Sequence, residues 1–181
     1  MSGLEDKQRL RETMKRLPPP SPETRARVVR AVAGWLRERR PGVVVGFLAM
    51  GDEIDMSPLV DELPEITFAL TRTAPGLSLT VHPFSAPRER HSFGFEQPAA
   101  DSPRIEPGEI DVVLVPGLAF SLDGRRLGRG AGYYDRFLAG LDADTVALTT
   151  SSRLRDDLPR EEHDVLMRWI ATEDGVKAVL G

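Results

Sequence analysis

A chain of 181 residues, 40% hydrophobic and 29% charged, has the composition of one globular domain and not of a disordered or fibrous protein. Its longest apolar run, Val43–Met50, is far shorter than the roughly 20 residues of a membrane helix, and no apolar signal-peptide core follows the charged N-terminus, so we expect a cytoplasmic protein. The absence of cysteine excludes disulfides, thiolate metal sites and a cysteine nucleophile.

Two helices are expected in the first forty residues. Leu4–Leu17 has a loosely helical apolar spacing and ends at three prolines, and a second helix begins at Ser21-Pro22 and runs to Arg40. This segment holds eleven Lys and Arg against five Asp and Glu, a net charge of +6, whereas the remainder carries −10. This uneven distribution of charge indicates that the N-terminal segment binds an anion. Alternatively, its arginines only form the solvated outer face of two amphipathic helices.

The rest of the chain alternates apolar strands with helices. Strands are expected at residues 43–48, 66–70, 77–82, 111–116, 144–149 and 166–171, and helices at residues 57–62, at 133–141 and after the last strand. Residues 83–109 contain five prolines and no periodicity, which predicts a long ordered loop. We therefore predict an α/β fold in a single domain over residues 1–181. Its sheet should be mainly parallel, Rossmann-like and covered by helices on both faces. Nothing demands an interface, so a monomer is expected.

A glycine-rich loop, Gly124-Arg-Arg-Leu-Gly-Arg-Gly-Ala-Gly132, leads into the helix expected at residues 133–141. Alternate glycines let backbone N–H groups converge on a ligand, and arginines 125, 126 and 129 supply charged donors suited to phosphate. The loop has neither the Gly-Lys-Ser/Thr of a Walker A loop nor the spacing of a dinucleotide fingerprint. We predict a polyanion site, with a purely structural turn as the alternative.

Aspartate and histidine are further residue types that could bind a metal ion. Asp135, just inside the expected helix, is either an ordinary first-turn carboxylate or a Mg²⁺ ligand beside nucleotide phosphates. The three histidines, His82, His91 and His163, lack metal-ligand spacing and are expected to be structural.

The stretches Val115-Pro-Gly-Leu-Ala-Phe120 and Asp123-Gly-Arg-Arg-Leu-Gly-Arg-Gly-Ala-Gly-Tyr-Tyr-Asp-Arg136 together resemble the signature of 5-formyltetrahydrofolate cyclo-ligases, also called 5,10-methenyltetrahydrofolate synthetases. Weaker similarities at Lys7–Arg11, Phe47–Ile54 and Pro159–Asp164 follow the family's order. The resemblance implies a cyclo-ligase-type fold and a ligase of folate one-carbon metabolism. It implies that ATP and Mg²⁺ drive conversion of 5-formyltetrahydrofolate to 5,10-methenyltetrahydrofolate with release of ADP and phosphate. In that reaction the formyl oxygen is phosphorylated and N10 closes the ring.

The resemblance also implies roles for individual residues. Lys7, Arg126 and Arg129 would be catalytic, by neutralising the phosphates. ATP would be bound by Lys7, Gln8, Arg9, Leu10, Arg11, Arg126, Leu127, Gly128, Arg129, Gly130, Ala131, Gly132, Tyr133 and Tyr134. The folate would be bound by Leu48, Glu53, Arg72 and Arg129, and Mg²⁺ by Asp135 and Asp164.

Some positions depart from the family's pattern. Arg72 follows Thr71 instead of the usual Pro, Ala131 replaces a Lys or Gly, and Leu166 replaces the Pro after His163-Asp164-Val. Residues 74–105 match the family poorly, so the wall of the folate pocket is not predicted.

Two other functions are compatible with the residues. One is an ATP-using relative that acts on a different substrate. The other is a non-catalytic module that binds RNA or DNA through its basic N-terminal segment, although the acidic body and the scarcity of aromatics among those arginines disfavour it. We therefore expect a reduced folate and ATP as partners, without nucleic acid or membrane.

Overall fold

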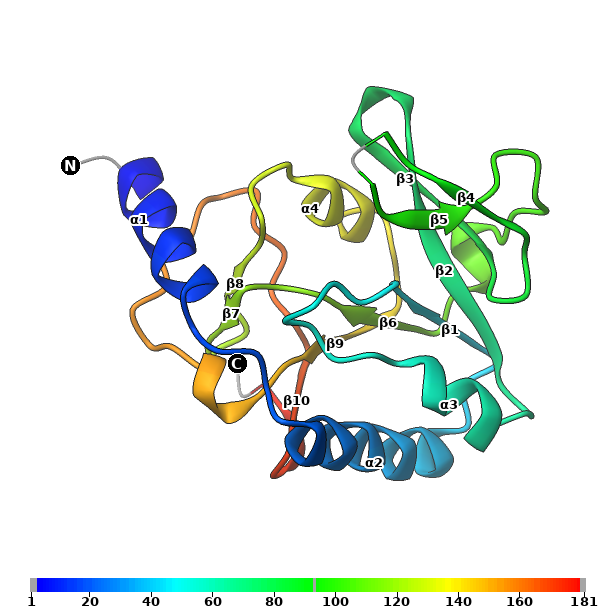
Figure 1. Cartoon of the computed structure of the whole chain (residues 1–181), viewed down its shortest axis with the longest axis horizontal. Helices are drawn as coiled ribbons and strands as arrows, with labels where there is room; N and C mark the ends of the chain where they lie inside the picture. Colours follow the sequence, from blue (N-terminus) through cyan, green and yellow to red (C-terminus); the bar gives the residue numbers. More distant parts are fainter. Residues whose placement is uncertain (1–2, 93, 180–181) are drawn as a thin grey trace.

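The computed structural model describes residues 3–92 and 94–179, with the side chains of residues 3–5 and 77 left out of the description (Figure 1). Its helices are α1 (Gly3–Lys15), α2 (Pro22–Arg39), α3 (Ser57–Glu62) and α4 (Tyr133–Leu138), with 3-10 turns at Pro75–Leu77, Pro107–Glu109 and Ser151–Arg153. Its strands are β1 (Val43–Gly46), β2 (Thr67–Ala74), β3 (Ser78–Pro83), β4 (Arg88–Arg90), β5 (Glu96–Pro98), β6 (Val112–Val115), β7 (Ala119–Phe120), β8 (Arg126–Leu127), β9 (Asp144–Leu148), β10 (Trp169–Thr172) and β11 (Gly175–Ala178). None of the helices within these ranges is long and apolar enough to cross a membrane.

The main sheet has seven strands in the order β11-β10-β9-β6-β1-β2-β3. The five central strands run parallel, and the edge strands β3 and β11 are antiparallel to their neighbours. The central strands are short runs of β-branched and other apolar residues, and β6 is buried along its whole length. Such runs suit strands that are covered on both faces, and the predicted mainly parallel sheet is confirmed.

Helices cover both faces of this sheet, as expected (Figure 1). On one face lie α2 and α3, and the apolar stripe of α2, including Val28, Val32 and Leu36, joins a core with β1 and β6. On the other face α4 packs beside irregular segments, and Leu138 contributes to a second core. Ser21 caps α2 by accepting a hydrogen bond from the Thr24 N–H at 3.1 Å, which confirms the predicted start of this helix.

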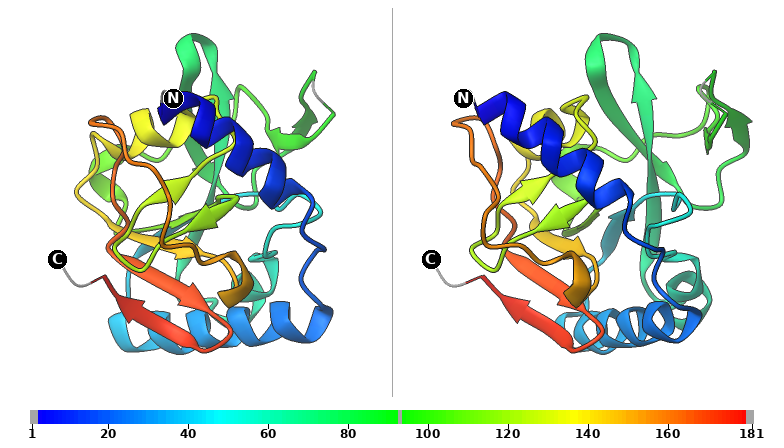
Figure 2. Two further views of the ribbon diagram at one scale, coloured as in Figure 1. Left: turned by 90° about the vertical axis from the view of Figure 1, so that its left-hand side faces the viewer. Right: turned by 60° about the vertical axis from the view of Figure 1, so that its left-hand side comes forward.

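Helix α1 lies away from the main sheet and crosses the small hairpin of β7 and β8 (Figure 2). Met14 of this helix is buried against Leu118, Leu127 and Leu158 in a third, separate apolar cluster. The basic N-terminal helix is therefore fixed to the hairpin that begins the glycine-rich loop.

The chain order of the strands creates a crevice. From β1 the chain continues to β2 and β3 on one side, then returns to place β6 on the other side of β1. The carboxyl ends of β1 and β6 therefore diverge at a switch point, which is where open α/β sheets bind ligands.

Three elements differ from the sequence prediction. The expected terminal helix is wrong, because Glu173-Asp174 forms a two-residue turn between β10 and β11, which pair as a hairpin. Residues 83–109 are only partly a loop, since β4 and β5 form a second hairpin there. The hairpin of β7 and β8 was also not predicted, because strands of two residues leave no periodic signal.

Candidate active site

A cavity of about 600 Å³ opens at the switch point, within the usual size of small-molecule sites. It is bordered by α1, the glycine-rich loop, the start of α4, the second half of β2 and the segments that follow β1 and β6. The predicted site residues that line it are Lys7, Arg11, Leu48, Glu53, Arg126, Leu127, Gly128, Arg129, Gly130, Ala131, Gly132, Tyr133, Tyr134, Asp135 and Asp164. Segments widely separated in the sequence thus converge on one site.

Four predicted site residues do not line this cavity. Gln8 and Arg9 are exposed on α1, and Leu10 packs against its apolar cluster. The helical period explains the division, because positions 7 and 11 share a face that positions 8 and 9 do not. Arg72 instead lines a neighbouring cavity and donates hydrogen bonds to Glu89 (2.5 Å) and to the Pro98 carbonyl (2.8 Å).

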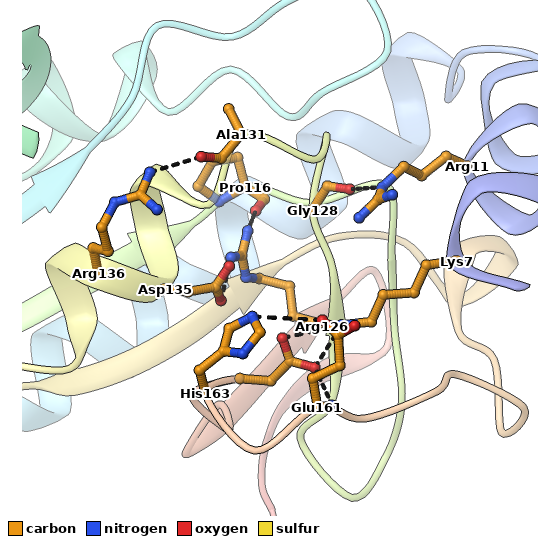
Figure 3. A network of polar contacts seen from close by, with 11 residues as sticks. Lys7, Arg11, Pro116, Arg126, Gly128, Ala131, Asp135, Arg136, Glu161 and His163 are labelled. Carbon is orange, nitrogen blue, oxygen red and sulfur yellow. Dashed lines mark hydrogen bonds and ion pairs between the residues drawn. The ribbon is translucent and has the colours of Figure 1, made fainter. Parts of the chain in front are cut away.

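Lys7 is buried between two carboxylates (Figure 3). Its Nζ lies 2.7 Å from Glu161 Oε2 and 2.8 Å from Asp164 Oδ2. Burial alone would lower the pKa of the ammonium, but the hydrogen bonds to Asp164 and Glu161 outweigh that effect and raise the pKa above its ordinary value. Lys7 therefore brings a fixed positive charge to the edge of the cavity.

The glycine-rich loop turns sharply above the cavity. Gly130 has φ of 110° and Gly132 has φ of 69°, conformations that a side chain would strain. Arg11 Nε donates to the Gly128 carbonyl at 3.0 Å, and Arg136 Nη2 donates to the Ala131 carbonyl at 2.7 Å (Figure 3). These contacts tie the loop to α1 on one side and to α4 on the other.

Arg126 points into the site from β8 (Figure 3). Its Nη2 lies 2.7 Å from Asp135 Oδ1, and its Nη1 donates to the Pro116 carbonyl at 3.3 Å. The buried Nε has no hydrogen-bond partner among the described residues. The guanidinium carbon also lies 5.7 Å from the centre of the Tyr134 ring, within the range of a cation–π contact.

Arg129 joins the loop to the segment after β1. Its Nη2 lies 2.8 Å from Asp52 Oδ1 and 3.0 Å from Glu53 Oε1. Glu53 is buried, and its second oxygen accepts the Met50 N–H at 2.9 Å. The carboxylate of Glu53 is thereby held at the cavity wall, which argues against its being a surface or helix-cap residue.

Two further residues of the glycine-rich motif, Arg125 and Tyr134, have different surroundings. Arg125 does not reach the cavity, because Asp123 (2.9 Å) and the carbonyls of Asp156 (3.0 Å) and Leu158 hold it. Tyr134 borders the cavity, its hydroxyl lies 3.2 Å from Thr71 Oγ1, and burial raises its pKa. Its hydroxyl is therefore neutral at ordinary pH.

The carboxylates of the site include one group of possible metal ligands. One ligand atom each from Glu161, His163 and Asp164 lies within 4.8 Å of the others. The predicted ligand Asp164 belongs to this group, whereas Asp135 belongs to no such group in the described ranges. His163 is thus placed with possible ligands despite its unpromising spacing, while His82 is buried and hydrogen-bonded to the Pro103 carbonyl, as a structural histidine should be.

Several lining residues escaped the sequence prediction. They include Phe95, Glu96 and Gln97 from the hairpin of β4 and β5, which fall in the segment that matches the family poorly. Gln97 is buried, and its Oε1 accepts hydrogen bonds from the N–H and hydroxyl of Thr73. No local pattern marks these positions, because their place depends on side-chain contacts of the hairpin with β2, such as those between Gln97 and Thr73.

Comparison with known proteins agrees with this geometry. The model of the 5-formyltetrahydrofolate cyclo-ligase family matches residues 4–173. A cyclo-ligase of Mycolicibacterium smegmatis is 45% identical over 83 residues, which cover 44% of this chain and 43% of that protein. The mouse cyclo-ligase is 29% identical over 146 residues, 71% of each chain. The solved structure of Aquifex aeolicus 5,10-methenyltetrahydrofolate synthetase has a TM-score of 0.78 and 27% identity, and the match covers 100% of this chain and 94% of that one.

Proposed function

Because the chain belongs to the 5-formyltetrahydrofolate cyclo-ligase family, we propose that it uses ATP and Mg²⁺ to convert 5-formyltetrahydrofolate to 5,10-methenyltetrahydrofolate. One observation supports this most strongly. The cations Lys7, Arg126 and Arg129 come from α1, β8 and the glycine-rich loop, and all three line one cavity beside the buried carboxylate of Glu53. A polyanion and a ligand with hydrogen-bond donors are the chemical partners that such a set of residues suits.

The proposed reaction has two steps. The formyl oxygen first attacks the γ-phosphorus of ATP, so that a new P–O bond forms while the bond to ADP breaks. N10 then attacks the formyl carbon, and the carbon–oxygen bond breaks as phosphate departs and N10 loses its proton. No covalent intermediate with the protein is required, so positioning and electrostatic stabilisation supply the catalysis.

Phosphate binding falls to four cations that line the cavity and to the backbone of the loop. In this proposal Lys7 and Arg11 provide the contacts from α1, and Arg126 and Arg129 provide those from the opposite side of the cavity. Gln8, Arg9 and Leu10 are not needed, because they lie outside the cavity.

Asp135 and Asp164 would hold Mg²⁺ together with phosphate oxygens. Carboxylate oxygens are the ligands that this ion prefers, and both side chains line the cavity next to phosphate-binding cations, Arg126 and Lys7 respectively. When bound, the ion would offset charge on the phosphates during transfer. Glu161 adds a third carboxylate on the Lys7 side.

The folate would lie along the segment after β1. Leu48 and Phe47 offer an apolar surface there. Glu53 has its two oxygens fixed by Arg129 and the Met50 N–H, yet a carboxylate has acceptor sites beyond these two bonds. It can therefore accept hydrogen bonds from the donor edge of a pterin and orient N5. Arg72 is proposed only as a neighbour of the folate, since it is held by Glu89.

A single assay separates this function from its alternatives. Purified protein is mixed with 5-formyltetrahydrofolate, with and without ATP and Mg²⁺, and the near-ultraviolet absorbance of the methenyl product is followed. Product formation that requires ATP is the expected result. ADP release with other formyl compounds or acids, but not with this folate, would indicate a relative of different specificity. Absence of turnover, with steeply salt-dependent binding to RNA or DNA, would indicate a binding module.

A further inference from the structure

Arg153 is a buried cation behind the site. It ends the 3-10 turn Ser151–Arg153, which follows the carboxyl end of β9, and its side chain is only about 5% exposed. Its Nη1 donates to the Leu118 carbonyl at 3.3 Å, and its Nη2 lies 3.5 Å from Asp52 Oδ2. It does not line the cavity.

This guanidinium is poorly satisfied for a buried charge. The contact of Nη2 with Asp52 is an ion pair without hydrogen-bond geometry, and Nη2 has no hydrogen-bond partner within the described residues. A buried charge with incomplete partners is unfavourable for folding, and an apolar side chain of similar size is often tolerated equally well or better. A gain in folding stability therefore does not account for an arginine at this position, whereas its contact with Asp52 does.

Asp52 is shared between two arginines. Its Oδ1 lies 2.8 Å from Arg129 Nη2, and its Oδ2 faces Arg153. Arg129 is also paired with Glu53 at 3.0 Å. Two carboxylates are thus balanced by two guanidinium groups, of which only Arg129 lines the cavity.

The backbone of this segment has its own anchor. Arg25 of α2 donates to the Glu53 carbonyl at 2.8 Å and to the Gly51 carbonyl at 2.5 Å. Loss of Arg153 would therefore leave the path of the segment in place, and would change mainly the charge balance around Asp52.

We propose that Arg153 is a positioning residue that shares Asp52 with Arg129 and so keeps the Arg129 guanidinium available to the nucleotide phosphates. Without Arg153, both carboxylates would be balanced by Arg129 alone and would hold it more strongly. ATP would then have to compete with Asp52 and Glu53 for this guanidinium. The inference rests on the proposed function only in taking ATP as the ligand of Arg129.

The test compares Arg153→Met with wild type in equilibrium ATP binding and in steady-state turnover. We expect the Kd and KM for ATP to rise about tenfold, which corresponds to the loss of one charge-assisted contact. The melting temperature should stay near that of wild type. Adding Asp52→Asn to this variant should restore ATP affinity to within about threefold, because the excess negative charge is gone.

Arg155→Met is the matched control. Arg155 lies two residues further along, pairs with Asp157 at 2.7 Å and does not line the cavity. The Arg155→Met variant should bind ATP with the affinity of wild type. Arg153→Lys, which retains the charge, should bind ATP more tightly than Arg153→Met. Arg153→Gln, which also removes the charge, replaces Arg153→Met should that variant fail to fold.

The outcomes separate the two proposals. If Arg153→Met binds ATP as tightly as wild type, or if Asp52→Asn does not restore its affinity, the positioning role is overturned. If wild type binds ATP but forms no methenyl product, the proposed function fails, while the ATP-binding comparison still decides the role of Arg153.

Discussion

The ion pairs of Lys7 offer the sharpest test of how α1 is attached. Lys7→Met keeps the length and much of the apolar stem of the side chain but removes the ammonium. Glu161 and Asp164 then lose a partner at 2.7 and 2.8 Å. The side chain of Asp164 is only 11% exposed, so water can replace this partner poorly, whereas that of Glu161 is 28% exposed and can be solvated better.

The expected destabilisation follows from these exposures. Breaking a fully buried ion pair by removing one partner costs about 3–5 kcal/mol, and a hydrogen bond to a charged group contributes about 1.5–3 kcal/mol. Because Glu161 is partly exposed, we expect Lys7→Met to lower the free energy of unfolding by about 2–3 kcal/mol, near the lower end of these ranges. For a protein of this length that corresponds to a fall in melting temperature of roughly 4–12 °C.

Urea denaturation followed by circular dichroism measures this difference directly. Lys15→Met is the control, since Lys15 is an exposed residue in the last turn of the same helix and tests the effect of the methionine itself. A free energy of unfolding for Lys7→Met within about 0.5 kcal/mol of wild type, the range of ordinary surface substitutions, would refute the reasoning.

Three further predictions concern charge. Burial alone would raise the pKa of Asp164, but the hydrogen bonds from Lys7 and from the Glu161 N–H, together with the charge of Lys7, outweigh burial and lower that pKa, so its stabilising contribution is lost as pH falls through the depressed value. Because the pKa of Lys7 is raised, its contribution is lost as pH rises through that value, so the stability gap between wild type and Lys7→Met should be widest from about pH 4 to pH 10. A gap that is constant from pH 2 to pH 10 contradicts this linkage. Arg129→Ala should lower kcat/KM for ATP about 30- to 1,000-fold, with Arg129→Lys intermediate, and an unchanged value removes this residue from the phosphate site. Asp135→Asn should raise the Mg²⁺ concentration needed for half-maximal activity, and an unaltered Mg²⁺ titration removes it from the metal site.

Much of the fold follows from local sequence. The central strands are short buried apolar runs, and Ser21-Pro22 marks the start of α2, so both could be predicted. The strand β4, Arg88-Glu-Arg90, is polar and only three residues long, and its pairing with β5 is a tertiary property without a periodic signal. The terminal hairpin does carry a local signal, because its two-residue turn Glu173-Asp174 is followed by Gly175, which has a φ of 123°.

The site was predictable where it depends on a motif or a helical period. The glycine-rich loop is one such part, and Lys7 with Arg11 on one face of α1 is another. The same period could have excluded Gln8 and Arg9, which are exposed. The role of Arg153 was not predictable, because its contact with Asp52 joins segments that lie about a hundred residues apart.

Transfer of oxygen from the substrate to phosphate tests the central claim most directly. 5-Formyltetrahydrofolate labelled with ¹⁸O in its formyl group is converted with unlabelled ATP, and the released phosphate is analysed by mass spectrometry. If ATP activates the formyl oxygen, each methenyl product formed is matched by one phosphate that carries one ¹⁸O. Phosphate without the label, or methenyl product formed in the absence of ATP, would contradict the account.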